Sequence, residues 1–269
     1  MNELEEIFQR VIDSFPLEQK RIPVEISKKK STLAKDTQDY QKAVAENDKY
    51  LMRVYQDILR SDEYDLRTYE EKSSFLRRPI KEDFIYRWQQ RDKFSKEVAI
   101  YADKNEMLCF HGTDILGAKH ILASGQISSG ADRLGHHTSF DPRGRISVTD
   151  KDTVDTSVGQ YMNMIGNFLY PAGCLFVVKP KDKAEYDNLS SRGWIIENVD
   201  FKSNPDRLIA IVTTPENQAR VKEWAHENGV ETDKVMKFES FIQRCKEHSR
   251  ETSKGRTHAI GKSQEQSYS

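Results

Sequence analysis

Three neighbouring residues with ligand-binding chemistry, His111, Gly112 and Thr113, follow directly after the apolar run 107–110. A histidine donates or accepts a hydrogen bond through either ring nitrogen, and a threonine adds a hydroxyl group. Glycine has no Cβ, so a ligand can approach the backbone closely at that position. The trio suits the binding of a ribose or an amide, although a strand that ends in a turn with a hydrogen-bonded histidine has the same pattern.

Further short segments with polar residues beside apolar runs follow in a fixed order. Residues 107–125 read as a strand, His-Gly-Thr and a helix that ends in Ser-Gly. The run Ile-Ser-Val-Thr-Asp at 146–150 precedes a helix-like stretch that contains Tyr161. An apolar strand at 173–178 comes next. The last segment, 194–212, carries a glutamate in a strand, then an Asn-Pro turn, then another apolar strand.

This order resembles the NAD-dependent ADP-ribosyltransferases of the diphtheria-toxin and poly-ADP-ribose-polymerase type. The resemblance covers roughly residues 107–215 and implies that NAD is the co-substrate. It also implies site roles: His111, Gly112 and Thr113 bind the nicotinamide end of NAD. In the same way, Tyr161 stacks on nicotinamide and Glu197 is the catalytic glutamate.

The chemistry of this family accounts for a glutamate at such a site. Breaking the bond between nicotinamide and ribose builds positive charge on the sugar, as in the oxocarbenium-like states of glycoside hydrolysis. A carboxylate placed under the sugar stabilises that charge, and Glu197 is expected to have this role, directly or through a ribose hydroxyl. Stacking by Tyr161 and a contact from His111 then hold the reacting groups in position.

Two positions depart from the family pattern. Ser147 aligns with the first aromatic residue of the family, so one half of the nicotinamide sandwich is either missing or comes from elsewhere, with Phe140 and Phe168 as candidates. Ile195, two residues before Glu197, stands where the arginine-modifying toxins have Glu or Gln. The second departure argues against the simplest arginine-specific mechanism and keeps a catalytically inactive protein-interaction module as an alternative.

A second alternative comes from Arg133, His136 and His137, because NAD-dependent RNA 2′-phosphotransferases carry an Arg with nearby His after their own His-Gly-Thr. Those enzymes also have a basic N-terminal winged-helix region, which the acidic helices of this chain do not resemble. ADP-ribosyl transfer to a protein is therefore the favoured function. Under it, Arg133 is expected to meet the pyrophosphate of NAD, with the two histidines near the adenosine end.

The N-terminal part of the chain has the spacing of amphipathic helices. Apolar residues recur every three or four positions from Glu3 until Pro16, which is expected to end the first helix. Ser31 is expected to cap a second, longer helix, with a loop at Pro23 between them, and a third helix is predicted at 81–103. Residues 1–104 therefore form a helical region, whose apolar stripe would be the binding surface of an interaction module.

Short apolar runs separated by Gly, Pro, Asn and Asp follow this region. They indicate an α+β fold: a helical N-terminal region packed on a split, mostly antiparallel NAD-binding sheet of the ADP-ribosyltransferase type, at residues 105–248. A polar tail at 249–269 is expected to be disordered. The predicted strands are 107–110, 145–148, 173–178, 193–201 and 208–213, and the predicted helices are 115–123, 154–164, 214–228 and 233–248.

Charge and cysteine content exclude several classes of function. The chain has 42 basic and 43 acidic side chains, so no overall field favours nucleic acid or an anionic membrane. Three widely spaced cysteines indicate reduced thiols, and no metal-binding spacing or secretory signal is found. We expect a cytoplasmic protein, or one delivered into a host cell without a classical signal peptide, as bacterial effectors are. Its expected partner is a protein substrate, including a host protein.

Overall fold

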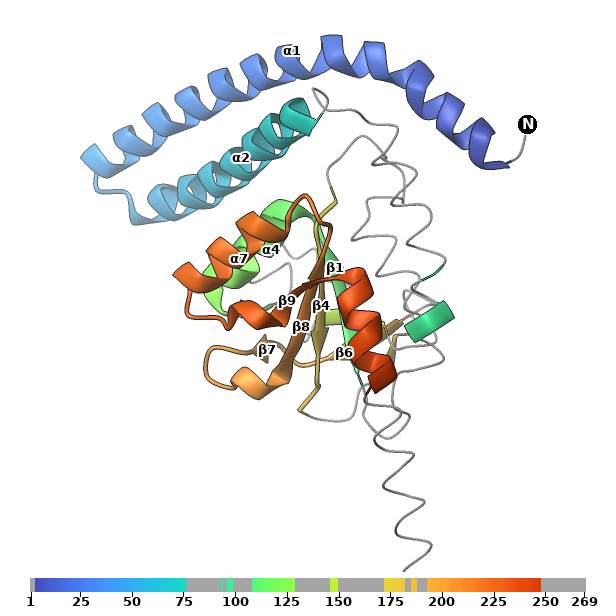
Figure 1. Cartoon of the computed structure of the whole chain (residues 1–269). Helices are drawn as coiled ribbons and strands as arrows, with labels where there is room; N and C mark the ends of the chain where they lie inside the picture. The colour runs from blue at the N-terminus through green and yellow to red at the C-terminus, as the bar shows by residue number, and fades with distance from the viewer. Residues whose placement is uncertain are drawn as a thin grey trace, which may run out of the picture.

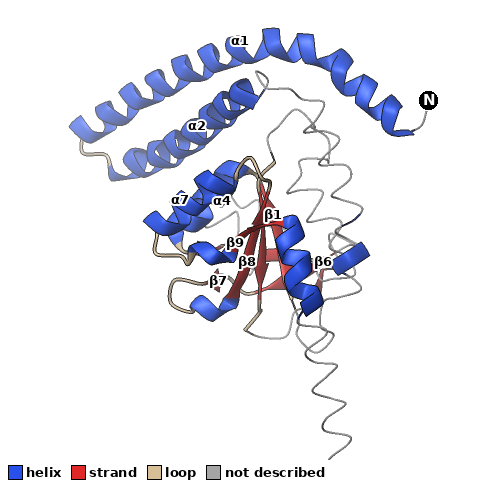
Figure 2. Cartoon of the chain, in the orientation of Figure 1, coloured by secondary structure: helices blue, strands red, loops and turns tan. Residues whose placement is uncertain are grey.

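The structure is a computed structural model in which helices and strands form one mixed α/β arrangement (Figure 1). Two long helices lie above a small β-rich unit that has helices on both faces of its central sheet (Figure 2). No helix among the residues described is long and apolar enough to cross a membrane. The structure describes residues 3–75, 93, 96–98, 108–128, 146–149, 172–181, 185–187 and 193–247.

The N-terminal helices α1 (Glu3–Ala45) and α2 (Lys49–Phe75) form an antiparallel hairpin. The turn between them is capped by Asp48, whose side chain accepts hydrogen bonds from the backbone N–H groups of Tyr50 and Leu51, both at 3.0 Å. Such a cap satisfies N–H groups that have no partner inside the helix, so the second helix begins sharply after the turn.

The structure corrects the predicted helix boundaries in this region. Pro16 does not end a helix and Pro23 is not in a loop, because both lie inside α1, which also runs through Ser31 without a break. Each proline removes one backbone hydrogen bond and bends a helix. Packing against α2 offsets this loss, since Ile22 beside the second proline is only 1% exposed. The curvature of α1 is visible in Figure 1.

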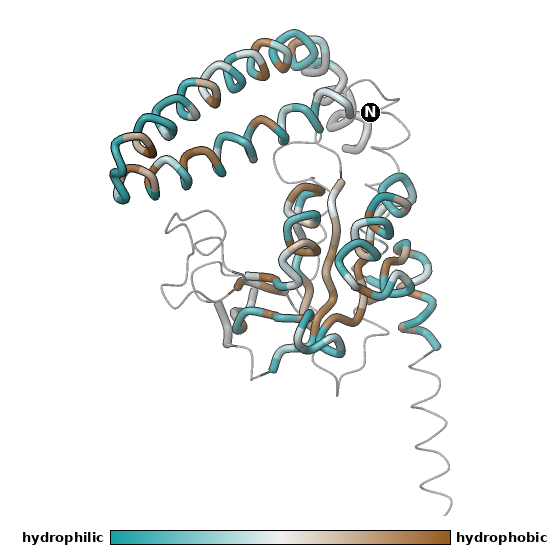
Figure 3. The backbone as a smooth tube through the Cα atoms, turned by 90° about the vertical axis from the view of Figure 1, so that its left-hand side faces the viewer, coloured by the Kyte–Doolittle hydropathy of each residue, from teal (hydrophilic) through white to brown (hydrophobic). Residues whose placement is uncertain are grey.

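Ion pairs join the two helices of the hairpin. The Lys72 ammonium is buried and lies 2.7 Å from the Glu18 carboxylate, and Lys29 lies 2.5 Å from Asp65. Most of the hairpin backbone carries polar residues, with short apolar stretches where the helices meet (Figure 3). The hairpin is therefore held by charged pairs together with a narrow apolar seam.

The central sheet has the strand order β1-β4-β8-β9, antiparallel except for the parallel pair β8–β9. All five residues of β4 are buried, because α4 (Ile115–Ser124) and α7 (Gln218–Glu227) cover one face of the sheet and the helix at 238–247 covers the other. The strands are β1 (Cys109–Thr113), β4 (Cys174–Val178), β8 (Leu208–Thr213) and β9 (Val235–Lys237).

Two smaller sheets complete the unit. One has the order β3-β6-β5, and the other pairs β2 with β7. Phe110 and Thr149 exchange backbone hydrogen bonds at 2.7 and 2.9 Å, which joins β1 to the chain at the end of β3. Every strand pair in these two sheets is antiparallel. These strands are β2 (Gln126–Ile127), β3 (Ile146–Val148), β5 (Glu185–Asp187), β6 (Gly193–Ile196) and β7 (Val199–Asp200).

Several predicted elements differ from the structure. The run 193–201 is two strands, separated at Glu197 and Asn198. The run 233–248 is not one helix, since a turn of 3-10 helix and β9 precede the helix at 238–247. Helix α7 begins after a turn, later than predicted, and β2 and β5 were not predicted. The predicted helix 154–164, the tail 249–269 and most of the predicted helix 81–103 lie outside the described residues.

Candidate functional site

The His-Gly-Thr residues lie inside strand β1, which corrects the prediction that they form a turn after it. His111, Gly112 and Thr113 pair with Phe176, Leu175 and Cys174 of β4. Side chains alternate along a strand, so those of His111 and Thr113 point to the same face of the sheet. Both are half-buried, whereas Gly112 is buried. The two side chains are thus held side by side with part of their surface accessible.

Asp114, directly after Thr113, links three parts of the structure. Its Oδ1 accepts a hydrogen bond from the N–H of Gly117 at 2.6 Å and so caps α4. Its Oδ2 accepts one from the hydroxyl of Tyr64 on α2 at 2.8 Å. The end of β1, the start of α4 and the N-terminal hairpin therefore meet at one carboxylate. Spacing alone indicates the cap, because Asp is a preferred residue before a helix.

Close backbone packing fixes the end of β1. A Cβ at Gly117 would lie 2.1 Å from Thr113 Oγ1, and a Cβ at Gly173 would lie 1.9 Å from the Thr113 carbonyl oxygen. The hydroxyl of Thr213 donates to the Gly173 carbonyl at 3.2 Å and holds that segment in place. Close approach was predicted at Gly112, whereas the structure shows it at Gly117 and Gly173, where the protein packs against itself.

A second chain of contacts leads from the hairpin to the same place. Glu71 of α2 pairs with Arg220 of α7 at 3.2 and 3.3 Å. Arg220 also donates to the side chain of Asn217 at 3.0 Å, and Asn217 donates to the Ala172 carbonyl at 2.7 Å. Ala172 precedes Gly173, whose backbone touches the end of β1. Nothing in the sequence pattern indicates this series of contacts, because Glu71 and Ala172 are far from Asn217 and Arg220 in the sequence.

A pocket of about 430 Å³ opens beside these contacts, between α2, α4 and α7. Its wall includes the Trp224 ring, with Lys119 at 5.4 Å and Arg220 at 5.5 Å from the ring centre. Cationic and anionic side chains are mixed around it, so it has no strong preference for one sign of charge. The lining residues are Arg67, Glu70, Glu71, Ser74, Leu116, Lys119, His120, Arg220 and Trp224.

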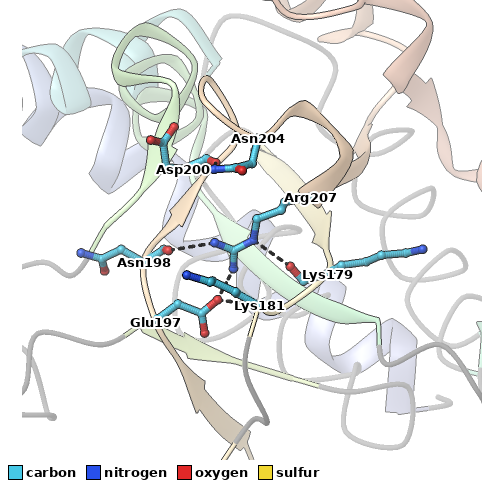
Figure 4. Close-up of polar contacts among 7 residues, drawn as sticks. All are labelled: Lys179, Lys181, Glu197, Asn198, Asp200, Asn204 and Arg207. Carbon is cyan, nitrogen blue, oxygen red and sulfur yellow. Dashed lines mark hydrogen bonds and ion pairs between the residues drawn. The ribbon is translucent and has the colours of Figure 1, made fainter.

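Glu197 lies between β6 and β7, and its contacts are shown in Figure 4. Its Oε1 accepts a hydrogen bond from the backbone N–H of Lys181 at 2.6 Å and forms an ion pair with Arg207. Arg207 also donates to the carbonyl oxygens of Lys179 at 3.2 Å and Asn198 at 3.3 Å. The ion pair therefore joins the chain after β4, the chain after β6 and the segment before β8.

The second oxygen of the Glu197 carboxylate, Oε2, takes no part in these contacts. Among the residues described, Oε2 has no hydrogen-bond partner, and the side chain is 28% exposed. A carboxylate oxygen in this state can accept a hydrogen bond from a hydroxyl group of a ligand. The structure therefore leaves half of this carboxylate available while the other half is fixed.

The structure does not bring Glu197 into contact with His111. Arg207, which holds Glu197, directly precedes Leu208, and Leu208 lies in the same cross-strand row as Cys109. His111 is two residues further along β1, so its row is separated from that of Arg207 by about 10 Å along the strand direction. A ligand in contact with both Glu197 and His111 would have to span this separation.

A turn near Arg207 depends on Asp200, which was not among the predicted site residues. The Asp200 carboxylate accepts hydrogen bonds from the backbone N–H of Ser203 at 2.9 Å and of Lys202 at 3.0 Å. The bonds from Ser203, followed by that from Lys202, hold the pKa of Asp200 below its usual range. Asp commonly accepts hydrogen bonds from backbone N–H groups two or three residues on, so the Asp of Asp-Phe-Lys-Ser at 200–203 is a recognisable signal for this turn.

The remaining predicted residues are only partly described. Ser147 lies in β3 opposite Ile195 of β6. Tyr161 and Arg133 lie outside the described residues, as do the aromatic and histidine alternatives near them, Phe140, Phe168, His136 and His137. Within the part of the chain that the structure describes, no group of His, Cys, Asp and Glu side chains has the arrangement of a metal site.

Comparison with known proteins adds no relative. No family model, no curated protein and no solved structure matches this chain. The function must therefore be argued from the chemistry and arrangement of its own residues.

Proposed function

We propose that the chain binds NAD and transfers its ADP-ribose group to a protein side chain with release of nicotinamide. The observation that carries this proposal is the order of three segments in space. Strand β3 contacts β1 through the Phe110–Thr149 pair and pairs along its length with β6. The segments that contain His111, Ser147 and Glu197 are therefore neighbours, as a shared dinucleotide site requires.

The described side chains fit the parts of NAD that the proposal assigns to them. His111 and Thr113 are half-buried on one face of β1 and offer a ring nitrogen and a hydroxyl to a ribose or to the nicotinamide amide. The Oε2 atom of Glu197 offers an acceptor to a ribose hydroxyl. Tyr161, as the stacking ring, and Arg133, at the pyrophosphate, complete the proposed site on the strength of the sequence resemblance alone.

The proposed reaction substitutes one group on the ribose carbon for another. The bond between C1′ and the nicotinamide nitrogen breaks, and its electron pair leaves with nicotinamide. Positive charge then develops on the ribose, where a carboxylate stabilises the transition state. An oxygen or nitrogen of the acceptor side chain bonds to C1′ and gives up its proton to solvent or to a nearby base.

One observation supports a different class of function, a binding module without catalysis. The Glu197 carboxylate already accepts a bond from Lys181 and pairs with Arg207. The positive charge of Arg207 offsets the negative charge that would stabilise a cationic ribose. A glutamate held in this way also serves purely to join three segments of chain, and no chemistry is then needed to account for it.

The decisive experiment combines calorimetric NAD binding, nicotinamide release and transfer of labelled ADP-ribose into a cell lysate. Wild type is compared with Glu197→Gln, which keeps an acceptor for Lys181, and with the control Glu223→Gln on the exposed face of α7. The proposal expects labelled protein bands with wild type and the control. It expects the rate of nicotinamide release by Glu197→Gln to fall by about 100-fold or more.

Other outcomes separate the alternatives. Binding of NAD without nicotinamide release by wild type supports the module, and the absence of NAD binding refutes the proposal. Removal of phosphate from a 2′-phosphorylated RNA, without labelling of protein, would assign the chain to RNA processing. Labelling that survives in Glu197→Gln would leave the activity intact and remove the role given to this residue.

A further inference from the structure

The N-terminal hairpin reaches the sheet through two polar contacts that converge on the end of β1. In the first, the Tyr64 hydroxyl donates to Asp114 Oδ2 at 2.8 Å. In the second, Glu71 pairs with Arg220, 3.2 Å apart. Tyr64 and Glu71 both belong to α2, which lies over α4 and α7 in Figure 1. The hairpin is therefore docked beside the His-Gly-Thr segment, although it is remote from it in sequence.

The first contact acts on the orientation of one carboxylate. The two oxygens of Asp114 have different partners, the N–H of Gly117 for Oδ1 and the Tyr64 hydroxyl for Oδ2. A planar carboxylate with both oxygens bonded has one preferred orientation, so Tyr64 helps to set the cap of α4. Because Asp114 follows Thr113 directly, its position also sets the backbone that carries the candidate NAD-binding side chains.

The second contact acts on the neighbouring strand. Arg220, which pairs with Glu71, also donates a hydrogen bond to the Asn217 side chain. The Asn217 side chain in turn donates to the Ala172 carbonyl oxygen. The next residue, Gly173, packs so closely on the Thr113 carbonyl oxygen that no side chain fits between them. A movement of the hairpin at Glu71 is therefore transmitted to the opposite side of the same backbone segment.

The surroundings of these contacts do not fix the hairpin by apolar packing alone. The pocket of about 430 Å³ between α2, α4 and α7 lies beside the Glu71–Arg220 pair and is lined largely by charged and polar side chains. The Tyr64 ring does pack at the edge of the apolar core. Polar junctions of this kind between parts of a chain commonly permit relative movement, so the two contacts determine the docked orientation.

We propose that the N-terminal hairpin positions the NAD-binding segment, with Tyr64 as a positioning residue that acts through Asp114. This inference rests on the proposed function for its consequence, which is tight binding of NAD. Its structural part, the ordering of residues 111–118 by the hairpin, is independent of NAD. The helical region then helps to order the NAD-binding segment, in addition to any surface that it offers to partners.

The test uses two pairs of matched variants in the full chain. Tyr64→Phe keeps the ring and removes the hydroxyl that reaches Asp114, whereas Tyr40→Phe removes a hydroxyl that accepts from Gln56 within the hairpin. Glu71→Gln weakens the pair with Arg220 across the junction. Its control is the adjacent Glu70→Gln, which weakens a pair with Lys30 inside the hairpin.

Three measurements are made on each variant: the thermal midpoint, backbone hydrogen exchange, and the KM and kcat for nicotinamide release. Tyr64→Phe is expected to speed exchange in residues 114–118 and to raise KM for NAD by about fivefold, the effect of one typical hydrogen bond. The kcat at saturating NAD should stay within about twofold of wild type, since bound NAD restores the order of the segment. Glu71→Gln should act in the same direction, and both controls should leave exchange and KM unchanged.

Two results would overturn the inference. One is unchanged exchange in residues 114–118 of Tyr64→Phe. The other is an equal effect of Tyr64→Phe and Tyr40→Phe on exchange and KM, which would show a general loss of stability. If wild type binds no NAD, the proposed function fails, and the exchange measurement still decides whether the hairpin orders this segment.

Discussion

Glu197 and Arg207 form an ion pair across the gap between the end of β6 and the start of β8. Both side chains are largely buried, with exposed fractions of 28% and 15%. The Arg207 guanidinium also donates hydrogen bonds to two backbone carbonyl oxygens, those of Lys179 and Asn198. The pair thus fixes the position of the one carboxylate for which catalysis is proposed, while one oxygen of that carboxylate takes no part in it.

Replacement of the arginine should show how much this ion pair contributes to stability. Arg207→Met leaves a half-buried carboxylate without its cation, so we expect the free energy of unfolding to fall by about 1–3 kcal/mol. Arg207→Lys should recover only part of this loss, since an ammonium cannot match the fork of contacts. Urea denaturation of Arg207→Met, of Glu197→Gln and of the double variant gives the coupling between the two residues. Additive effects in this cycle would contradict the ion pair.

The cap of α4 makes a separate contribution to stability. Asp114→Ala removes the acceptor for Gly117 and for Tyr64, and we expect a loss of about 1–2 kcal/mol. Asp114→Asn keeps an oxygen for the cap and should lie within about 0.5 kcal/mol of wild type. Urea denaturation at neutral pH measures the free energy of unfolding of both variants. An equal loss in the two variants would mean that charge, and not the hydrogen bonds, gives Asp114 its effect.

Close packing at Gly173 predicts strong intolerance of a methyl group. The added Cβ of Gly173→Ala would lie 1.9 Å from the Thr113 carbonyl oxygen and 2.5 Å from the backbone carbon of Asp114. Both obstacles are backbone, so we expect destabilisation of about 3 kcal/mol. Gly229→Ala is the control, because its Cβ meets nothing within 4 Å and only its φ of +71° opposes the change, at about 1 kcal/mol. Similar midpoints for the two variants in thermal unfolding would argue against this packing.

A buried thiol predicts a loss of stability in alkali. Burial raises the pKa of Cys174 from 9.0 to about 12, against a smaller opposing effect of its hydrogen bond with Thr213. The unfolded chain releases this proton near pH 9 and the folded chain keeps it. The stabilisation is therefore complete below pH 9 and is lost between pH 9 and about 12.

Comparison with Cys174→Ala isolates this thiol from other alkaline titrations. We expect the free energy of unfolding of wild type to fall with pH more steeply than that of the variant, by up to about 1.4 kcal/mol per pH unit. Urea denaturation between pH 8 and 10.5 measures both slopes. Parallel curves would show that the thiol ionises equally easily in the folded chain.

Local rules predicted the helical character of the N-terminal region but misplaced its boundaries. Pro16 and Pro23 are residues that usually break a helix. The hydrogen bonds that they remove are offset by contacts with a distant segment of the chain, which the neighbouring sequence does not reveal. The burial of Ile22 and Lys72 between the two helices is such a contact. The second helix begins just after Asp48, an ordinary capping residue. The prediction gave the two prolines more weight than this residue.

The C-terminal error has a similar origin in distant pairing. Val235 and Phe238 have a spacing that fits a helix, and a helix was predicted through both. In the structure Val235 pairs with Ile211 in a parallel ladder, and the helix begins only at residue 238. A short apolar run fits a strand or a buried helix equally well, and only its partner strand decides between them.

At the candidate site, residue types were predictable and their partners were not. The sequence indicated the strand before His111 and the helix after Asp114, and both are confirmed in outline. The partners of Glu197 and Asp114, which are Arg207 and Tyr64, belong to other elements of the fold and have no local signature. The roles in NAD binding stay predictions.

The length of α1 gives the docked hairpin a mechanical property. At 43 residues the helix is about 65 Å long, and among the residues described the hairpin contacts the β-rich unit through Tyr64 and Glu71 of α2. The hairpin is therefore a long, continuous pair of helices with a contact to the β-rich unit at Asp114. A partner that binds the far end of α1 and moves the hairpin would therefore alter the His-Gly-Thr backbone without contacting it.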